Sequence, residues 1–380
     1  MSNLNKELTS TILSAGPITF ENFMEISQFG ERGYYSSGNP ISQSGDFYTS
    51  PSAHPMFGSL IAIQLKQMWD LLDGIQPFTV VEIGAGNGSL AADITEYAKT
   101  LDSNFYRSLN YLAFDLFPKR GQHYPILHAS NLPKNINGCV ISNELLDAMP
   151  VHRFQINNGK ILEEFVRLNG TRLENTLSRP SASQILDRVK PFLNNLPEGY
   201  KGEVNTRLMK WGRQLNNILK LGWILTIDYG ADREQLYDPQ RIGGTLRTYY
   251  KHTLGQNPFI NIGKQDITTF VDFTALEDAM IANNFSYVGH KIQSTFLENL
   301  GACQIHKHSH NKSITRIERR INEKGMQALL DPNGMGRFRV IIHSKKVNKK
   351  RLIGLSRNLK SFDFPEVPMI KNNRHINLLG

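Results

Sequence analysis

The sequence has few residues that bind metals or form disulfides. Its 380 residues include only two cysteines, Cys139 and Cys303. Two thiols are too few for a disulfide framework or a cysteine zinc site, so redox chemistry is not expected and a reducing compartment suits the chain. The alternating His306, His308 and His310 have no carboxylate nearby to complete a coordination shell, so we expect no metal site.

Long apolar segments are also missing. No run approaches about 18 uninterrupted apolar residues, so we expect no membrane span. The first twenty residues contain no apolar signal region and no arginine-rich transit pattern. We therefore expect a cytoplasmic protein. Nothing in the sequence indicates its oligomeric state.

Positive charge is scarce over most of the chain and is concentrated at its C-terminus. Residues 301–380 carry 17 Lys and Arg against 5 Asp and Glu, an imbalance larger than the net charge of +9 of the whole chain. The densest part, 345–360, lies in a basic C-terminal tail that we place at 344–380. Such a run is typical of a solvated tail, and it leaves nucleic acid, an acidic protein or an anionic surface open as partners.

The hydrophobic pattern changes near residue 76. Apolar residues recur at three- and four-residue spacing over 56–72, which predicts an amphipathic helix. We expect an N-terminal helical region at 1–75, interrupted by a Gly- and Ser-rich loop at 30–48. From Phe78 onward, short apolar runs alternate with segments of helical length.

This alternation predicts an α/β fold with a doubly wound, mostly parallel sheet and a ligand at the carboxyl ends of its strands. The core of the fold is expected at 76–150 and 203–343, with an insertion at 151–202 between them. We predict strands at 78–83, 111–116, 125–129, 138–142 and 223–228, and helices at about 88–100, 144–149 and 203–220.

A glycine-rich turn follows the first predicted strand, in the segment VVEIGAGNGSL at 80–90. Its centre comprises Gly84, Ala85, Gly86 and Gly88. Glycines allow positive φ angles and a close approach of a ligand to the backbone. Ser89 stands where a dinucleotide fingerprint has glycine, and Glu82 would repel a pyrophosphate. A carboxylate here favours a cationic ligand without phosphates, which fits S-adenosylmethionine better than NAD.

Two further residues at strand ends add to this candidate cofactor site. Asp115 ends the next predicted strand, where its two carboxylate oxygens can accept hydrogen bonds from both hydroxyls of a ribose. Asn131, after the third strand, is a weaker candidate for contacting adenine. Glycine turns also join strands to helices where no ligand binds, so the combination of the turn with Glu82 and Asp115 carries the prediction. An NAD-dependent oxidoreductase is the least favoured class.

Acidic residues follow the fourth predicted strand in the segment SNELLDAMP at 142–150. Asn143 is a good helix N-cap, and Glu144 and Asp147 would then share one face of a short helix. A structural role is the alternative, because acidic residues stabilise a helix N-terminus. The end of this strand lies over the methyl donor in such an architecture, so all three are candidate catalytic residues. Asp228, after the fifth strand, is equally compatible with an acceptor contact and a turn.

Several collinear motifs resemble those of the MidA-like methyltransferases, a family that includes the mitochondrial complex I assembly factor that methylates an arginine. The resemblance extends to about residue 343. The motifs are GPITFENFM at 16–24, GYY at 33–35, GDFYTSP at 45–51, MFG at 56–58, VVEIGAGNGSL at 80–90, SNELLDAMPVHRF at 142–154, LTIDYG at 225–230, GTLRTYYKH at 244–252, DITTFVDF at 266–273, FLENLG at 296–301 and MGRF at 335–338.

This resemblance implies a class I, Rossmann-like methyltransferase with extra helical elements and S-adenosylmethionine as cofactor. It implies that the segment 45–51 folds over the cofactor, which adds Asp46 and Thr49 to the cofactor-binding candidates. Asn143 would contact the donor or the acceptor. Glu144 would hold the guanidinium of an arginine, assisted by Asp147. The implied partner is a protein substrate such as a respiratory complex I subunit.

The sequence departs from the family at Ser52, at Phe270 and in the glycine turn, which reads GAGNG where the family often has GPGRG. Ser52 and Phe270 stand where the family often has an acidic residue and a histidine. All glycines of the turn are kept, so cofactor binding is expected to be intact, whereas the acceptor stays open. The alternatives are a methyltransferase for a small molecule, one for RNA bound through the basic tail, and an assembly factor that binds S-adenosylmethionine without catalysis.

Overall fold

The computed structural model describes residues 3–37, 49–118, 123–251, 253–309, 313–347, 351–356, 365–371 and 374–378. The chain divides into two compact units, each built from separate stretches of sequence. The first unit comprises Met1–Phe47, Leu146–Trp211 and Gly230–Ala279, and the second comprises Tyr48–Leu145, Gly212–Tyr229 and Met280–Gly380. The N-terminal region expected at 1–75 is thus divided between the two units.

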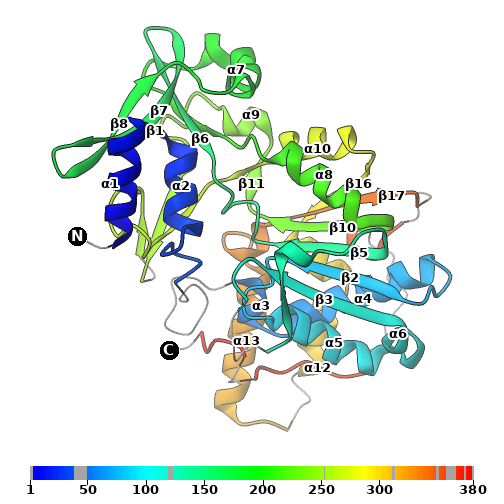
Figure 1. The fold of residues 1–380 in the computed structure, drawn as a ribbon. Coiled ribbons are helices and arrows are strands. Elements are labelled where there is room, and N and C mark those ends of the chain that lie inside the picture. Colours follow the sequence, from blue (N-terminus) through cyan, green and yellow to red (C-terminus); the bar gives the residue numbers. More distant parts are fainter. Residues whose placement is uncertain are drawn as a thin grey trace. The chain divides into compact units, whose positions relative to one another are not determined.

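Among the described residues, a seven-stranded sheet forms the centre of the second unit (Figure 1). Its order is β16-β17-β10-β5-β2-β3-β4. The five strands from β10 to β4 pair in parallel, and β17 is antiparallel to both of its neighbours. The strands span Phe78–Ile83 (β2), Leu109–Asp115 (β3), Ile126–His128 (β4), Ile136–Asn143 (β5), Leu219–Asp228 (β10), Ser286–Ile292 (β16) and Arg339–Lys345 (β17).

This sheet confirms the predicted α/β fold with a doubly wound, mostly parallel sheet. The five predicted strands correspond to β2, β3, β4, β5 and β10. Strands β3 and β10 begin earlier than predicted, at Leu109 and Leu219. The sequence pattern conceals these starts because polar residues such as Asn110 and Lys220 interrupt the apolar runs there.

The helix predicted over 56–72 is α4, Met56–Leu71. Its N-terminal ten residues are buried on every side, because α4 packs against α5, α12 and strand β5. The other helices of the second unit include α3 (Ser50–Ala53), α5 (Ser89–Leu101), α6 (Ser103–Ser108), α11 (Gln293–Asn299), α12 (Ala302–Ser309) and α13 (Arg316–Leu330). In the described part of the chain, no helix combines the length and apolar character needed to cross a membrane.

Two helix predictions fail where tertiary contacts decide the backbone. The segment 144–149 is not helical, because Glu144 takes a left-handed φ of 49° and its N–H donates a 2.8 Å hydrogen bond to the carbonyl of Ile227. Asn143 is the last residue of β5 and is not an N-cap. The helix predicted over 203–220 is shorter, at Leu208–Ile218 (α8), because strand β9 (Lys201–Val204) precedes it and β10 follows it directly.

The segment 151–202, which the sequence marks only as an insertion, forms most of an antiparallel sheet in the first unit. Strand β1 (Ile18–Thr19) joins this sheet by pairing with β7, so that Ile18 lies opposite Val166. The sheet contains β6 (His152–Asn157), β7 (Lys160–Asn169), β8 (Arg172–Ser178) and β9. The unit also contains α1 (Asn3–Ala15), α2 (Phe20–Phe29), α7 (Ser183–Val189), α9 (Arg233–Leu236), β11 (Gly230–Ala231), β12 (Arg247–Tyr250), β13 (Thr253–Gly255), β14 (Asp266–Thr268) and β15 (Val271–Asp272), and α10 spans Phe273–Ala282.

Described parts of the basic C-terminal segment pack against helices of the second unit. Ile353 and Gly354 contact α4, and Glu366, Arg374 and His375 contact α5. Arg374 forms ion pairs with Asp93 and Glu96, and His375 Nε2 lies 2.9 Å from Asp93 Oδ2. The carbonyl of Glu366 accepts a 3.1 Å hydrogen bond from the hydroxyl of Tyr97. Glu366, Arg374 and His375 are therefore docked on the fold, and for the charge run at 345–360, of which 348–350 and 357–360 lie outside the described residues, a solvated tail stays a prediction.

Candidate active site

Four polar side chains predicted or considered as site residues stand at the carboxyl ends of neighbouring parallel strands. Glu82, Asp115, Asn143 and Asp228 lie at or next to the last residues of β2, β3, β5 and β10. Parallel strands end at the same edge of a sheet, so the second unit brings these residues to one edge. This is the edge at which doubly wound sheets bind ligands.

The glycine turn after β2 has a backbone that side chains would disturb. Gly84, Gly86 and Gly88 have φ angles of 79°, 56° and 79°. A Cβ atom on Gly84 would lie 2.8 Å from Cδ1 of Leu145, so any other residue there would strain the backbone and would also require the Leu145 side chain to shift. The N–H groups of Gly84 and Ala85 both donate to the carbonyl of Phe114, which fixes the turn against β3. The result is an exposed-backbone cradle of the kind that a nucleoside ligand approaches closely.

Asp115 is held between this turn and the chain that follows β3. Its Oδ2 accepts a 2.9 Å hydrogen bond from the N–H of Gly86, and its Oδ1 accepts one of 2.9 Å from the N–H of Phe117. Each carboxylate oxygen has two acceptor sites, so these two bonds leave capacity for a vicinal diol. The contact of Asp115 with a ribose stays a prediction.

Glu82 is 3% exposed, and its Oε2 accepts a 2.8 Å hydrogen bond from the hydroxyl of Tyr111. Burial raises the pKa of Glu82 to about 8, and the nearby charge of Asp115 acts in the same direction. The Tyr111 hydroxyl opposes the shift without cancelling it. Glu82 is therefore largely protonated at neutral pH. The negative charge expected for Glu82 from the sequence is absent from most molecules at this pH. A cation bound nearby would favour the ionised form.

Asn143 and Glu144 meet at the end of β5. The Nδ2 of Asn143 donates to Oε1 of Glu144 at 3.0 Å, and the backbone N–H of Ser50 donates to the same oxygen at 3.1 Å. The Oδ1 of Asn143 is buried and has no hydrogen-bond partner among the described residues. A buried acceptor of this kind can be satisfied by a water molecule or by a ligand group. The ammonium of S-adenosylmethionine is a donor of this kind.

Asp147 does not share a helix face with Glu144, because the segment between them is not helical. Asp147 belongs to the first unit, where its carbonyl accepts a 3.0 Å hydrogen bond from the N–H of Thr269. Its charge also raises the pKa of Tyr35, after the larger effects of burial and of Asp266. The hydroxyl of Tyr35 donates to both carboxylate oxygens of Asp266, at 3.0 and 3.1 Å.

Asp228 has contacts that favour the turn role over the acceptor role. It is 1% exposed, its Oδ2 accepts a 3.2 Å hydrogen bond from the N–H of Leu145, and its Oδ1 accepts one of 2.9 Å from the N–H of Tyr229. These bonds fix the backbone directly after β5 and β10. Asp228 therefore holds in place the peptide group that follows Glu144.

The remaining predicted cofactor residues have different placements. Asp46 lies outside the described residues. Thr49 is the N-cap of α3, and its N–H donates to Oγ of Ser52 at 3.0 Å. Ser52 thus completes a capping box at the start of α3. Asn131 is exposed at the end of the short 3-10 helix that follows β4.

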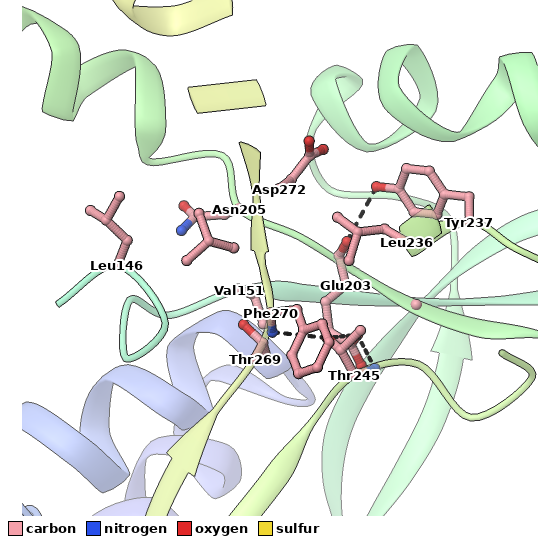
Figure 2. A pocket seen from close by; sticks show the side chains of 12 residues that line it. Leu146, Val151, Glu203, Asn205, Leu236, Tyr237, Thr245, Thr269, Phe270 and Asp272 are labelled. Atoms are coloured by element: carbon pink, nitrogen blue, oxygen red, sulfur yellow. Dashed lines mark hydrogen bonds between the residues drawn. The ribbon is translucent and has the colours of Figure 1, made fainter. Parts of the chain in front are cut away.

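The first unit contains a small cavity that the sequence does not predict (Figure 2). Its volume is about 20 Å³, which is room for about one water molecule. Glu203 Oε2 accepts hydrogen bonds from the N–H and hydroxyl of Thr245, and that hydroxyl oxygen accepts one from the N–H of Phe270. Burial raises the pKa of Asp272, on the cavity wall, to about 6. The cavity is too small for an arginine side chain.

Comparison with known proteins identifies the family and the class of cofactor. A family model for S-adenosyl-L-methionine-dependent methyltransferases matches residues 60–291. The chain is 26% identical to the Drosophila melanogaster "Protein arginine methyltransferase NDUFAF7 homolog, mitochondrial" over 89% of this chain and 84% of that protein. It is 25% identical to the Homo sapiens protein of the corresponding name, over 87% of this chain and 80% of that one.

A solved structure agrees over nearly the whole chain. A Burkholderia thailandensis protein crystallised with S-adenosyl-homocysteine superimposes with a TM-score of 0.82 at 26% identity, covering 94% of this chain and 96% of that one. The glycine cradle, the fixed Asp115 and the buried acceptor of Asn143 fit the same class of cofactor. The family model covers more than half of the chain, and the protein is therefore a class I enzyme of the MidA-like family of S-adenosylmethionine-dependent methyltransferases.

Proposed function

We propose that this methyltransferase modifies an arginine side chain of a protein substrate and that Glu144 holds the acceptor guanidinium. The observation that carries the proposal is the placement of Glu144 at the end of β5, with Oε1 fixed by two hydrogen bonds. A carboxylate of fixed orientation can pair with a guanidinium through two parallel hydrogen bonds. The names of the curated relatives support an arginine acceptor.

In this proposal each residue has a limited task. S-adenosylmethionine supplies, when bound, an electrophilic methyl group. The glycine turn and Asp115 bind and orient the nucleoside, and Asn143 Oδ1 accepts a hydrogen bond from the ammonium. Glu144 orients the acceptor nitrogen and takes the proton that this nitrogen loses as it gains the methyl group. Positioning of this kind supplies most of the rate enhancement in a displacement that needs little other acid–base chemistry.

The finer assignments are proposals of the same kind. A respiratory complex I subunit is the substrate that the family resemblance suggests. Nucleic acid bound through the C-terminus is not favoured. Two cations of this segment, Arg374 and Lys371, pair with Asp93 and Glu96 of this chain. The cytoplasmic location stays a prediction, and the curated relatives are named mitochondrial.

The test is transfer of labelled methyl groups from S-adenosylmethionine to protein extracted from cells that lack this enzyme, followed by amino-acid analysis. We expect methylarginine in one or a few proteins. Glu144→Gln keeps the side-chain size, so we expect it to bind S-adenosylmethionine as the wild type does and to lose about 100-fold or more in transfer. Label recovered in RNA or small molecules, or equal transfer by the variant, would overturn the proposal.

A further inference from the structure

Glu144 is held by a residue that lies 94 positions earlier in the chain. The backbone N–H of Ser50 donates a 3.1 Å hydrogen bond to Oε1 of Glu144. The Nδ2 of Asn143 donates to the same oxygen at 3.0 Å. Asn143 is the immediate neighbour of Glu144 and moves with it, so Ser50 supplies the donor that is anchored elsewhere in the second unit.

Ser50 is itself fixed by buried polar contacts. Ser50 and Gln293 are both completely buried, and the hydroxyl of Ser50 donates a 3.1 Å hydrogen bond to Oε1 of Gln293. Gln293 is held in turn at the start of α11, where its N–H donates to the carbonyl of Phe338 at 2.7 Å and its Nε2 to that of Leu329 at 3.3 Å. Buried polar residues that are satisfied in this way have one well-defined position.

The short helix α3 explains why this N–H is available. The first N–H groups of a helix have no partner within it, and Ser50 is the first residue of α3, directly after its N-cap, Thr49. The next residue, Pro51, has no N–H. The other end of α3 is held by the C-terminal segment, because the N–H of Ile376 donates to the carbonyl of Ser52 at 2.9 Å.

We propose that Ser50 is a positioning residue that orients Glu144 for the acceptor through its backbone N–H. The donor to Glu144 is the backbone N–H of residue 50. The side chain of residue 50 affects this hydrogen bond only by keeping the peptide group in place. The hydroxyl of Ser50 and Gln293 keep that peptide group in place. This inference rests on the proposed function, because an orientation of Glu144 matters only if Glu144 contacts the acceptor.

A pair of substitutions separates the peptide group from the hydroxyl. Ser50→Pro removes the N–H and places the ring where the proton points, while the first position of a helix accepts proline and the extended Thr49 (φ −94°, ψ 158°) suits a following proline. Ser50→Ala keeps the N–H and loses the bond to Gln293. We expect kcat to fall by about 100-fold in Ser50→Pro and by about fivefold or less in Ser50→Ala.

The remaining readouts distinguish positioning from damage to the fold. The Kd for S-adenosylmethionine should stay within about twofold of the wild type in both variants, and Ser50→Pro combined with Glu144→Gln should be no worse than Glu144→Gln alone. The inference would be overturned if the kcat losses of Ser50→Pro and Glu144→Gln multiplied in the double variant. It would also be overturned if kcat fell as much in Ser50→Ala as in Ser50→Pro. Neither outcome would contradict the role of Glu144. An active Glu144→Gln enzyme would overturn both.

A measurement on the intact wild-type backbone covers the case in which Ser50→Pro does not fold. With selective ¹⁵N-serine labelling, the amide proton of Ser50 should resonate downfield in the wild type and shift upfield in Glu144→Ala, because its hydrogen bond to the carboxylate is lost. Serine amides at the opposite edge of the same sheet, such as that of Ser108 directly before the start of β3, serve as controls. An unchanged Ser50 amide in Glu144→Ala would contradict the contact on which the inference depends.

Discussion

The N–H of Gly86 donates a 2.9 Å hydrogen bond to Oδ2 of Asp115, which joins the turn after β2 to the end of β3. The carboxylate that is predicted to bind the ribose thus also sets the shape of the glycine turn. One substitution at this position should affect both properties. Measuring them separately shows whether the two roles coincide in one side chain.

Asp115→Ala should weaken S-adenosylmethionine binding by about 10- to 100-fold, because two charge-assisted acceptor positions are lost. The same variant should lose about 1 to 2 kcal/mol of stability, since the N–H groups of Gly86 and Phe117 lose their partner. Calorimetric titration and thermal unfolding measure the two effects. Asp187→Ala, at an exposed position of α7, is the control. Unchanged affinity in Asp115→Ala would remove Asp115 from the cofactor site.

The elevated pKa of Glu82 predicts a pH-dependent stability. Burial raises this pKa from 4.5 to about 8, so between these values the folded protein keeps a proton that the unfolded chain releases. The contribution of protonated Glu82 to the free energy of unfolding is fully present below pH 4.5 and is lost as the pH rises through about 8. Glu82→Gln does not titrate and keeps an acceptor for Tyr111. Its stability relative to the wild type should therefore rise with pH, by up to about 1.4 kcal/mol per unit.

Unfolding in denaturant at about pH 6, 7, 8 and 9 measures the difference in the free energy of unfolding between variant and wild type. Taking this difference removes the pH dependence that the other titrating groups contribute to both proteins. Glu234→Gln, at an exposed position of α9, is the matched control and should show a constant difference. A constant difference for Glu82→Gln as well would mean that Glu82 is ionised in the folded protein.

Gly84→Ala should be destabilising and should also impair cofactor binding. The added Cβ combines a φ of 79° with a 2.8 Å contact to Leu145, whereas Gly159 has a φ of 67° and nothing within 4 Å of an added Cβ. We expect Gly159→Ala to cost about 1 kcal/mol from backbone strain alone and Gly84→Ala to cost roughly 2 to 3 kcal/mol. Thermal unfolding measures the costs, and calorimetric titration should show weaker S-adenosylmethionine binding in Gly84→Ala only. Equal effects of the two would refute the steric argument.

The C-terminal segment should contribute to stability mainly through Arg374. The carboxylate of Asp93, with 3% of its side chain exposed, would lose its guanidinium partner in Arg374→Met, which should cost about 2 to 4 kcal/mol. Lys371→Met removes an exposed pair with Glu96 and should cost about 0.5 kcal/mol or less. Denaturant titration compares them. If both variants are as stable as the wild type, the segment does not dock in solution as it does here.

Much of the second unit could be predicted because its strands contain short, mostly apolar runs, as in β2 (FTVVEI), and because the parallel order of the strands defines the edge at which a ligand binds. The turn at Glu144 could not be predicted, because its left-handed backbone depends on the carbonyl of Ile227, far away in the sequence. The hydrogen bond between Ser50 and Glu144 could not be predicted for the same reason, because the two residues lie 94 positions apart, although Ser50 belongs to the motif GDFYTSP. In the first unit, β8 (RLENTLS) is mostly polar and has no fully buried residue, so neither an alternating pattern nor an apolar run predicts it.

Strand β1 pairs with β7 in a register that places Ile18 opposite Val166. On the ribosome, the N-terminal strand must therefore wait for its partner while roughly 150 residues are added, which takes about 10 to 30 seconds at usual elongation rates. The last stretch of the first unit, ending at Ala279, is translated later still. Nascent chains halted before Ile267 is translated should leave the apolar residues of α1 and α2 without part of their buried cluster.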